Sequence, residues 1–133
     1  MLKNKTIFIV EDDAFNLAII RTLLRHQGAI VPFDHWGDNT ITRIQKYSTK
    51  IDMILLDLML YDGISGHDIF KLIKEQPALS DIPVVAVSAA DPGIEIPKTQ
   101  AAGFNGFISK PIKPQIFPKQ IVALLNGKEI WGG

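Results

Sequence analysis

The stretch that decides the fold is Ile-Asp-Met-Ile-Leu-Leu-Asp-Leu-Met, residues 51–59. Four apolar residues follow one another from Met53 to Leu56 without alternation, which is typical of a strand covered on both faces in a parallel sheet. Asp57 ends this run. Because open parallel sheets bind their ligands at the carboxyl ends of central strands, Asp57 is a candidate functional residue. An aspartate here also suits a simple turn, so the stretch alone leaves both interpretations open.

The rest of the chain alternates apolar, β-branched runs with stretches of helical periodicity. Further strands are predicted over residues 6–10, 29–33, 82–87 and 106–109, and helices over 13–28, 38–47, 66–77 and 118–127. Pro32 favours an edge position for the second strand. This alternation predicts a doubly wound α/β domain, in which helices cover both faces of a five-stranded parallel sheet.

The segment 91–102 carries two prolines where a fourth helix is expected. Pro92 suits a first helical position, but Pro97 removes an amide donor and clashes with the preceding turn, at a cost of about 3 kcal/mol in a helix interior. Proline also pushes the residue before it, Ile96, toward an extended conformation. We therefore predict an irregular stretch over 91–96 and a short helix over 97–102, capped by Gly103.

Composition excludes several classes of function. Lys plus Arg equals Asp plus Glu, 14 each, so no basic field favours nucleic acid as a direct partner. The absence of cysteine excludes disulfides, thiol catalysis and thiolate-bound zinc. No apolar run approaches the ~20 residues of a membrane span, and the N-terminus lacks the apolar segment of a signal peptide. We expect one cytoplasmic domain over residues 1–127, followed by a short tail over 128–133.

Polar residues follow the predicted strands at one edge of the sheet. Besides Asp57, they are Glu11, Asp12, Ser88 and Lys110. Each has an ordinary interpretation alone, as a helix cap, a turn or a surface residue, but their shared position indicates a site. Three converging carboxylates repel one another and so bind protons or a cation, and an oxygen-only set favours Mg²⁺. Asp57 is then the natural nucleophile for a phosphoryl group, with the lysine and hydroxyl holding the other oxygens.

With these residues the chain resembles the receiver domain of response regulators in two-component signalling. The matching motifs span nearly the whole chain and are Val10-Glu11-Asp12-Asp13, Leu56-Asp57-Leu58-Met59-Leu60, Val87-Ser88-Ala89 and Phe107-Ile108-Ser109-Lys110-Pro111. The resemblance implies a flavodoxin-like strand order, 2-1-3-4-5. It also implies that Asp57 is the phosphoacceptor and that Glu11 and Asp12 form an acidic pocket. Asp12, Asp57 and the backbone carbonyl of Met59 would contact Mg²⁺.

The resemblance extends to the residues that respond to phosphorylation. Ser88 takes the place of the switch hydroxyl and Lys110 that of the invariant lysine, which normally precedes a cis proline, here Pro111. Phe107 fills the aromatic switch position, often a tyrosine. A departure is Tyr61, which stands where the family usually has proline, in a loop to residue 66 that is one residue longer than the common form.

The implied function is that of a single-domain regulator in a phosphorelay. A histidine kinase or a histidine phosphotransfer protein would supply the phosphoryl group, and the output would be a contact with a downstream protein. We expect the output surface to include Ile94 and Ile96 beside Phe107, or alternatively to lie near the first helix. The protein would hydrolyse its own phosphoryl group slowly, without being a turnover enzyme, because Met59 and Ala90 offer no side chain to orient water.

Three alternatives compete with this interpretation. An aspartyl-phosphate hydrolase usually carries a second aspartate two residues after the nucleophile, where this chain has Met59. A flavodoxin-like cofactor binder needs a phosphate-cradling loop after the first strand, and here that loop is acidic. A pseudo-receiver, acting as an interaction module without phosphorylation, usually lacks a pocket residue, whereas this chain retains all of them.

Overall fold

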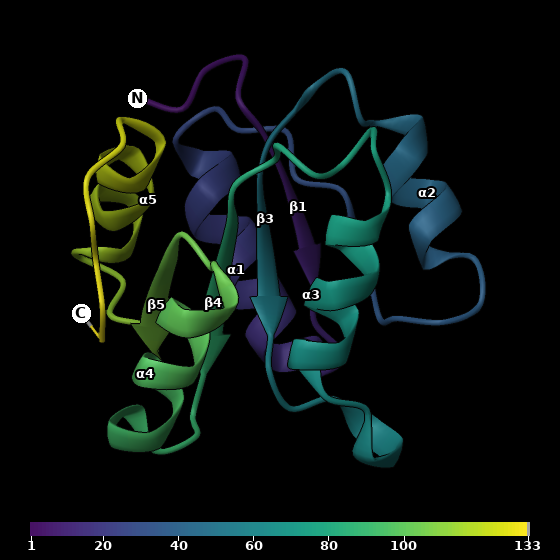
Figure 1. The fold of residues 1–133 in the computed structure, drawn as a ribbon. Helices are drawn as coiled ribbons and strands as arrows, with labels where there is room; N and C mark the ends of the chain where they lie inside the picture. Colours follow the sequence, from purple (N-terminus) through teal and green to yellow (C-terminus); the bar gives the residue numbers. More distant parts are fainter. Residues whose placement is uncertain (133) are drawn as a thin grey trace.

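A computed structural model describes residues 1–132 of the chain, with the side chain of Asp62 left out. Strands and helices alternate along the sequence (Figure 1). The strands are β1 (Thr6–Val10), β2 (Phe33–Asp34), β3 (Ile51–Asp57), β4 (Val84–Ser88) and β5 (Gly106–Ser109). The helices are α1 (Ala14–His26), α2 (Thr40–Lys46), the 3₁₀ turn η1 (Tyr61–Gly63), α3 (Gly66–Glu75), α4 (Pro92–Ala102) and α5 (Phe117–Leu125). All pairs in the sheet are parallel, in the order β2-β1-β3-β4-β5, which confirms the predicted doubly wound fold.

Alternate residues of each central strand point to opposite faces of the sheet. In β1, Ile7 and Ile9 pack with apolar residues of α1 and α5, whereas Phe8 packs with residues of α2 and α3 on the other face. All five residues of β1 are buried. The sheet is therefore covered on both faces, and the carboxyl ends of the strands form the edge that is left open for a site.

The second strand is shorter than predicted and lies at the sheet edge, as Pro32 indicates. Only Phe33 and Asp34 form β2, and Ile30 makes an isolated bridge to Thr6. The backbone amide of Ile9 donates to the carbonyl of Pro32. The proline lies on the outer strand, where its missing amide costs no bond within the sheet.

The prediction of an irregular stretch over 91–96 is wrong, because α4 is a continuous helix from Pro92 to Ala102 with Pro97 inside it. Pro97 lies only in the second turn, so its missing amide deprives the carbonyl of Gly93, which is exposed to water. The side chain of Asp91 caps the helix by accepting from the Gly93 amide at 2.9 Å. Gly103, with φ of 101°, ends the helix as predicted.

Two further contacts hold α4 in place. The buried hydroxyl of Thr99 donates to the carbonyl oxygens of Glu95 and Ile96, at 2.9 and 3.0 Å. The Glu95 carboxylate lies 2.7 Å from Nε2 of His67, at the start of α3. Neither contact could be predicted from the spacing of these residues, and both favour the helical conformation that Pro97 disfavours.

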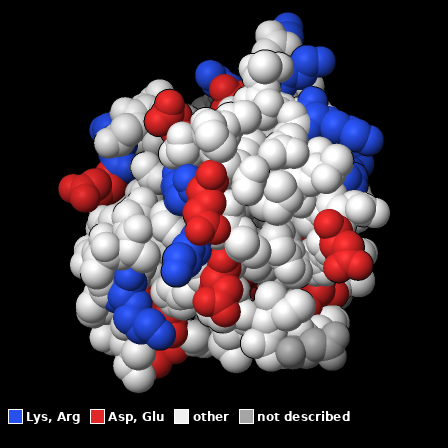
Figure 2. All heavy atoms as spheres, turned by 45° about the vertical axis from the view of Figure 1, so that its right-hand side comes forward, with Lys and Arg blue, Asp and Glu red and all other residues white. Residues whose placement is uncertain are grey.

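Within residues 1–132, no helix is long and apolar enough to cross a membrane. The face drawn in Figure 2 carries basic and acidic side chains interspersed, rather than one continuous field of a single sign. Gly133, the last residue of the expected tail, lies outside the described residues. Residues 128–132 run beside β5 in the same direction, and Trp131 makes a parallel bridge to Phe107.

Candidate functional site

The residues predicted to form a site lie together at the carboxyl edge of the sheet. Asp57 is the last residue of β3, Ser88 is the last residue of β4, and Lys110 follows β5. Glu11 and Asp12 follow β1 directly. A pocket at this edge is lined by Asp12, Asp13, Asn16, Asp57, Met59, Tyr61, Ala89 and Lys110.

Three carboxylates form one cluster at the base of this pocket. Glu11, Asp12 and Asp57 each place an oxygen within 4.8 Å of the others. Glu11 is 2% exposed and Asp57 is 6% exposed. Burial, followed by the hydrogen bond and charge of Glu11, raises the pKa of Asp57 from 3.8 to about 7. Ionising all three carboxylates here costs free energy, and a cation would lower that cost. Because the available ligands are all oxygens, the cluster suits a hard divalent cation such as Mg²⁺.

The ammonium group of Lys110 bridges two of these carboxylates. Its Nζ lies 2.7 Å from Oε1 of Glu11 and 3.4 Å from Oδ2 of Asp57. Burial disfavours the charged ammonium, but the bond to Glu11 and the charges of both carboxylates outweigh that cost and raise the pKa of Lys110. The lysine therefore stays charged near neutral pH. Its peptide bond to Pro111 is cis, as the resemblance implies.

The Asp57 carboxylate is fixed by the backbone around it. Its Oδ1 accepts from the Met59 amide at 3.0 Å, which leaves Oδ2 toward Lys110. Gly66, at the start of α3, allows this close packing because a Cβ there would lie 2.5 Å from the Asp57 carbonyl oxygen. On the next strand, the buried Ser88 hydroxyl accepts from the Ala90 amide at 3.0 Å.

The loop after β3 reaches the cluster through Tyr61. Its backbone amide donates to Oδ2 of Asp12. A proline at this position has no amide to donate, so the departure from the usual residue creates a contact between the loop and the acidic pocket. The Tyr61 side chain itself is 66% exposed.

Two residues that the sequence did not single out as site residues, Asp13 and Asn16, also line the pocket. Asp13 caps α1, because its Oδ1 accepts from the amides of Phe15 and Asn16. Its own amide also donates to Glu11 at 3.3 Å. Asn16 faces the pocket from the first turn of α1, and its position three residues after the cap was the available signal.

The expected output residues differ in their access to solvent. Phe107 is fully buried, whereas Ile94 is 59% exposed and Ile96 is half-buried. In this conformation a partner can reach the helical surface of α4 but not the ring of Phe107. The switch roles of Phe107 and Ser88 stay predictions.

Known proteins resemble this chain in sequence and in fold. A family model described as response regulator receiver domain matches residues 7–122. The polar-differentiation response regulator DivK of Brucella anthropi is 29% identical over 122 residues, which are 92% of this chain and 97% of that protein. Chemotaxis protein CheY4 of Vibrio cholerae superposes with a TM-score of 0.80 at 18% identity, over 90% of this chain and 98% of that chain.

A second solved structure is the receiver domain of sensor histidine kinase PA1611 from Pseudomonas aeruginosa, which has a magnesium ion coordinated in its active-site cleft. It superposes with a TM-score of 0.77 at 22% identity and covers 92% of this chain and 98% of that chain. At these identities the two solved structures show a shared fold alone.

Proposed function

This chain belongs to the response regulator receiver domain family, and we propose that it acts in a phosphorelay in which Asp57 accepts a phosphoryl group. The observation that carries the proposal is the Asp57 carboxylate, buried at the end of β3 with a lysine ammonium 3.4 Å away. Its relatives are response regulators, not turnover enzymes. A pseudo-receiver is less well supported, because the acidic cluster, the hydroxyl and the lysine are all present at one edge of the sheet.

The transfer step follows from the positions of these groups. A carboxylate oxygen of Asp57 forms the bond to phosphorus, while the bond from phosphorus to the donor's imidazole nitrogen breaks and the nitrogen keeps its electron pair. Lys110, which has three N–H donors, can donate to a phosphoryl oxygen, and the Ser88 hydroxyl, which accepts from the Ala90 amide, can donate its O–H to another. Both groups then neutralise charge that develops during transfer.

The acidic cluster supports a role for Mg²⁺ in this step. Asp12, Asp57 and the backbone carbonyl of Met59 would hold the ion, with Glu11 beside it, and the ion would neutralise charge on the phosphoryl oxygens. The magnesium ion in the cleft of the Pseudomonas receiver domain supports the choice of metal. Asp12 must share its oxygens between the Tyr61 amide and the ion, so the loop after β3 is expected to adjust when the ion binds.

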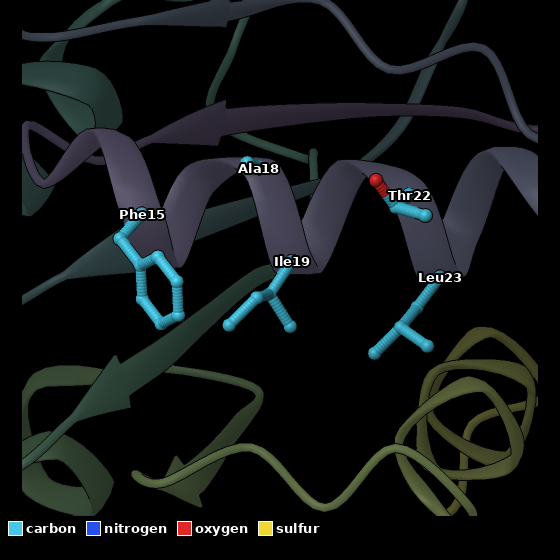
Figure 3. Close-up of a pocket in the computed structure, with 5 residues that line it drawn as sticks. All are labelled: Phe15, Ala18, Ile19, Thr22 and Leu23. Atoms are coloured by element: carbon cyan, nitrogen blue, oxygen red, sulfur yellow. The ribbon is translucent and has the colours of Figure 1, made fainter.

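We infer that the phosphodonor, a histidine kinase or a histidine phosphotransfer protein, docks on α1. Phe15, Ile19 and Leu23 project from one side of this helix (Figure 3), and Phe15 is 75% exposed. Asn16, one residue further along, already lines the pocket around Asp57. A donor that brings its imidazole to Asp57 therefore passes directly over this apolar stripe.

The phosphorylated form should be long-lived. The Met59 side chain is 63% exposed at the mouth of the pocket, and Ala90 follows the switch hydroxyl by two residues. Neither side chain donates or accepts a hydrogen bond, so neither can align a water behind phosphorus.

The cytoplasmic location also stays a prediction.

Incubation with acetyl phosphate and Mg²⁺, followed by intact mass measurement, tests the proposal. The unaltered chain should gain the mass of one phosphoryl group, and Asp57→Asn should gain none. Asp38→Asn removes an exposed carboxylate that does not line the pocket, and this variant should be labelled fully. Full labelling of Asp57→Asn would show that another residue is the acceptor.

A further inference from the structure

The segment Lys128–Gly132 runs along the outer edge of β5 and joins it by a parallel bridge between Trp131 and Phe107. The Phe107 amide donates to the carbonyl of Ile130 at 2.9 Å, and the Gly132 amide donates to the carbonyl of Phe107 at 2.7 Å. The Ser109 hydroxyl adds a bond to the Gly132 carbonyl at 3.4 Å. In Figure 1 this segment, in yellow, runs beside α5 in the same direction as β5. The segment therefore occupies the backbone groups that an edge strand otherwise presents to water.

Two glycines, Gly106 and Gly132, lie where this segment packs against β5 and α4. At Gly106 a Cβ would lie 3.1 Å from the Ile130 carbonyl oxygen and 2.8 Å from Leu124, so a larger residue there would press on the segment beside β5. At Gly132 the φ angle is 88°, and a Cβ would lie 2.9 Å from Ile96 of α4. Any other residue at position 132 would have a strained backbone conformation, so this position favours glycine.

The side chains of Ile130 and Trp131 pack on opposite faces of the sheet at its edge. Trp131 is half-buried against the core cluster that contains Phe107, and Ile130 packs against the cluster on the opposite face. Backbone pairing with alternating side-chain seats is the pattern by which extended peptides add to a sheet. The contact has the features of a peptide-binding site rather than of a passive tail.

We propose that the outer edge of β5 is a binding site for an extended peptide and that Lys128–Gly132 is its built-in occupant. The site takes a parallel strand with an apolar residue, then an aromatic residue opposite Phe107, then a glycine against α4. A protein partner that presents such a segment must compete with the tethered one. Because tethering gives the built-in segment an effective concentration in the millimolar range, free peptide at micromolar concentration should not displace it.

Hydrogen exchange at the Phe107 amide tests this proposal. This amide donates to the Ile130 carbonyl, so its exchange rate reports whether the segment is in place. In full-length Trp131→Ala the amide should exchange at least tenfold faster than in the unaltered chain. A peptide with the sequence of residues 127–132 should then restore slow exchange, while the same peptide with alanine in place of tryptophan should not. The unaltered chain should show no response to either peptide.

Trp36→Ala is the matched control. Trp36 is also half-buried and packs against the same cluster, so its loss removes a comparable contact without touching the β5 edge. Exchange at Phe107 should stay within about threefold of the unaltered chain, and the peptide should have no effect. If Trp131→Ala does not fold, Gly132→Val serves instead, because its side chain meets Ile96 while Trp131 is kept.

Three results would overturn the proposal. The first is an unchanged exchange rate at Phe107 in a folded Trp131→Ala or Gly132→Val chain. The second is a fast rate that the native peptide does not slow. The third is exchange in the unaltered chain that slows as protein concentration rises, which would show that a second copy supplies the segment.

Discussion

Replacing Asp57 by asparagine should make the metal-free protein more stable at pH 8. Burial beside Glu11 raises the pKa of Asp57 from 3.8 to about 7 in the native site. Between pH 4 and pH 7 the native state therefore binds more protons than the unfolded state, and its free energy of unfolding falls as the pH rises through this window. The asparagine side chain carries no charge at any of these pH values, so the variant escapes this fall.

The size of the gain follows from the two pKa values. Their difference corresponds to about 4 kcal/mol at full strength, at about 1.4 kcal/mol per pH unit. Asp57 lines a pocket that opens to water and Lys110 lies nearby, so solvent screening should reduce the gain to about 1–2 kcal/mol. That corresponds to about 3–8 °C in Tm for a domain of this size. The variant keeps the bond from the Met59 amide, because an asparagine Oδ1 also accepts it.

Urea unfolding in the presence of EDTA, at pH 8 and at pH 5, measures the effect. At pH 8 the free energy of unfolding of Asp57→Asn should exceed that of the unaltered chain by about 1–2 kcal/mol. At pH 5 the difference should be about a third of that at pH 8, because the unfolded carboxyl has lost its proton above pH 4 while the native carboxyl keeps its proton until about pH 7. Asp38→Asn removes an exposed carboxylate and should change stability by less than about 0.5 kcal/mol at either pH. A variant no more stable at pH 8, or equally stabilised at pH 5, would refute the reasoning.

Three other predictions concern the metal, the lifetime and α4. Millimolar Mg²⁺ should raise the Tm of the unaltered chain at pH 8, because the ion binds the carboxylate cluster of the native state and not the unfolded state. It should barely affect Asp57→Asn, which lacks one of these carboxylates. Equal shifts of Tm in calorimetry would argue against the site. Met59→Asn should speed loss of the phosphoryl group measured by mass, whereas Met59→Leu should not; equal rates would show that water is aligned elsewhere. Pro97→Ala should raise the free energy of unfolding in urea by about 1 kcal/mol, with a smaller effect for Pro92→Ala at the helix start; a loss of stability would contradict the cost assigned to Pro97.

The strands and the strand-end residues could be predicted because their signals are local. The apolar run that ends at Asp57 and the β-branched run before Glu11 are both buried strands in the structure. Asp13 caps α1, as its place before the apolar periodicity indicates. Parallel pairing then brings the strand ends to one edge, so the acidic cluster follows from the order of elements without any knowledge of side-chain contacts.

The contacts that sequence could not predict join residues far apart in the chain. Pro97 has a real local cost, but Thr99 and the pair between His67 and Glu95 oppose it, and nothing in the spacing of these residues indicates that they meet. The same holds for the bridge that Trp131 makes to Phe107 in β5. Gly106 and Gly132 were visible in the sequence, yet the close approach that each permits depends on the tertiary fold.

The positive charge of Lys110 is shared between two carboxylates. Its ammonium lies closer to Glu11 than to Asp57, so in the metal-free site it mainly neutralises a carboxylate that is not the proposed nucleophile. A phosphoryl group on Asp57 adds negative charge beside the same ammonium, and Glu11 then needs another positive charge nearby. The need for a cation thus follows from the lysine as much as from the three carboxylates. Lys110 follows directly on β5, the strand whose outer edge is bridged by Trp131.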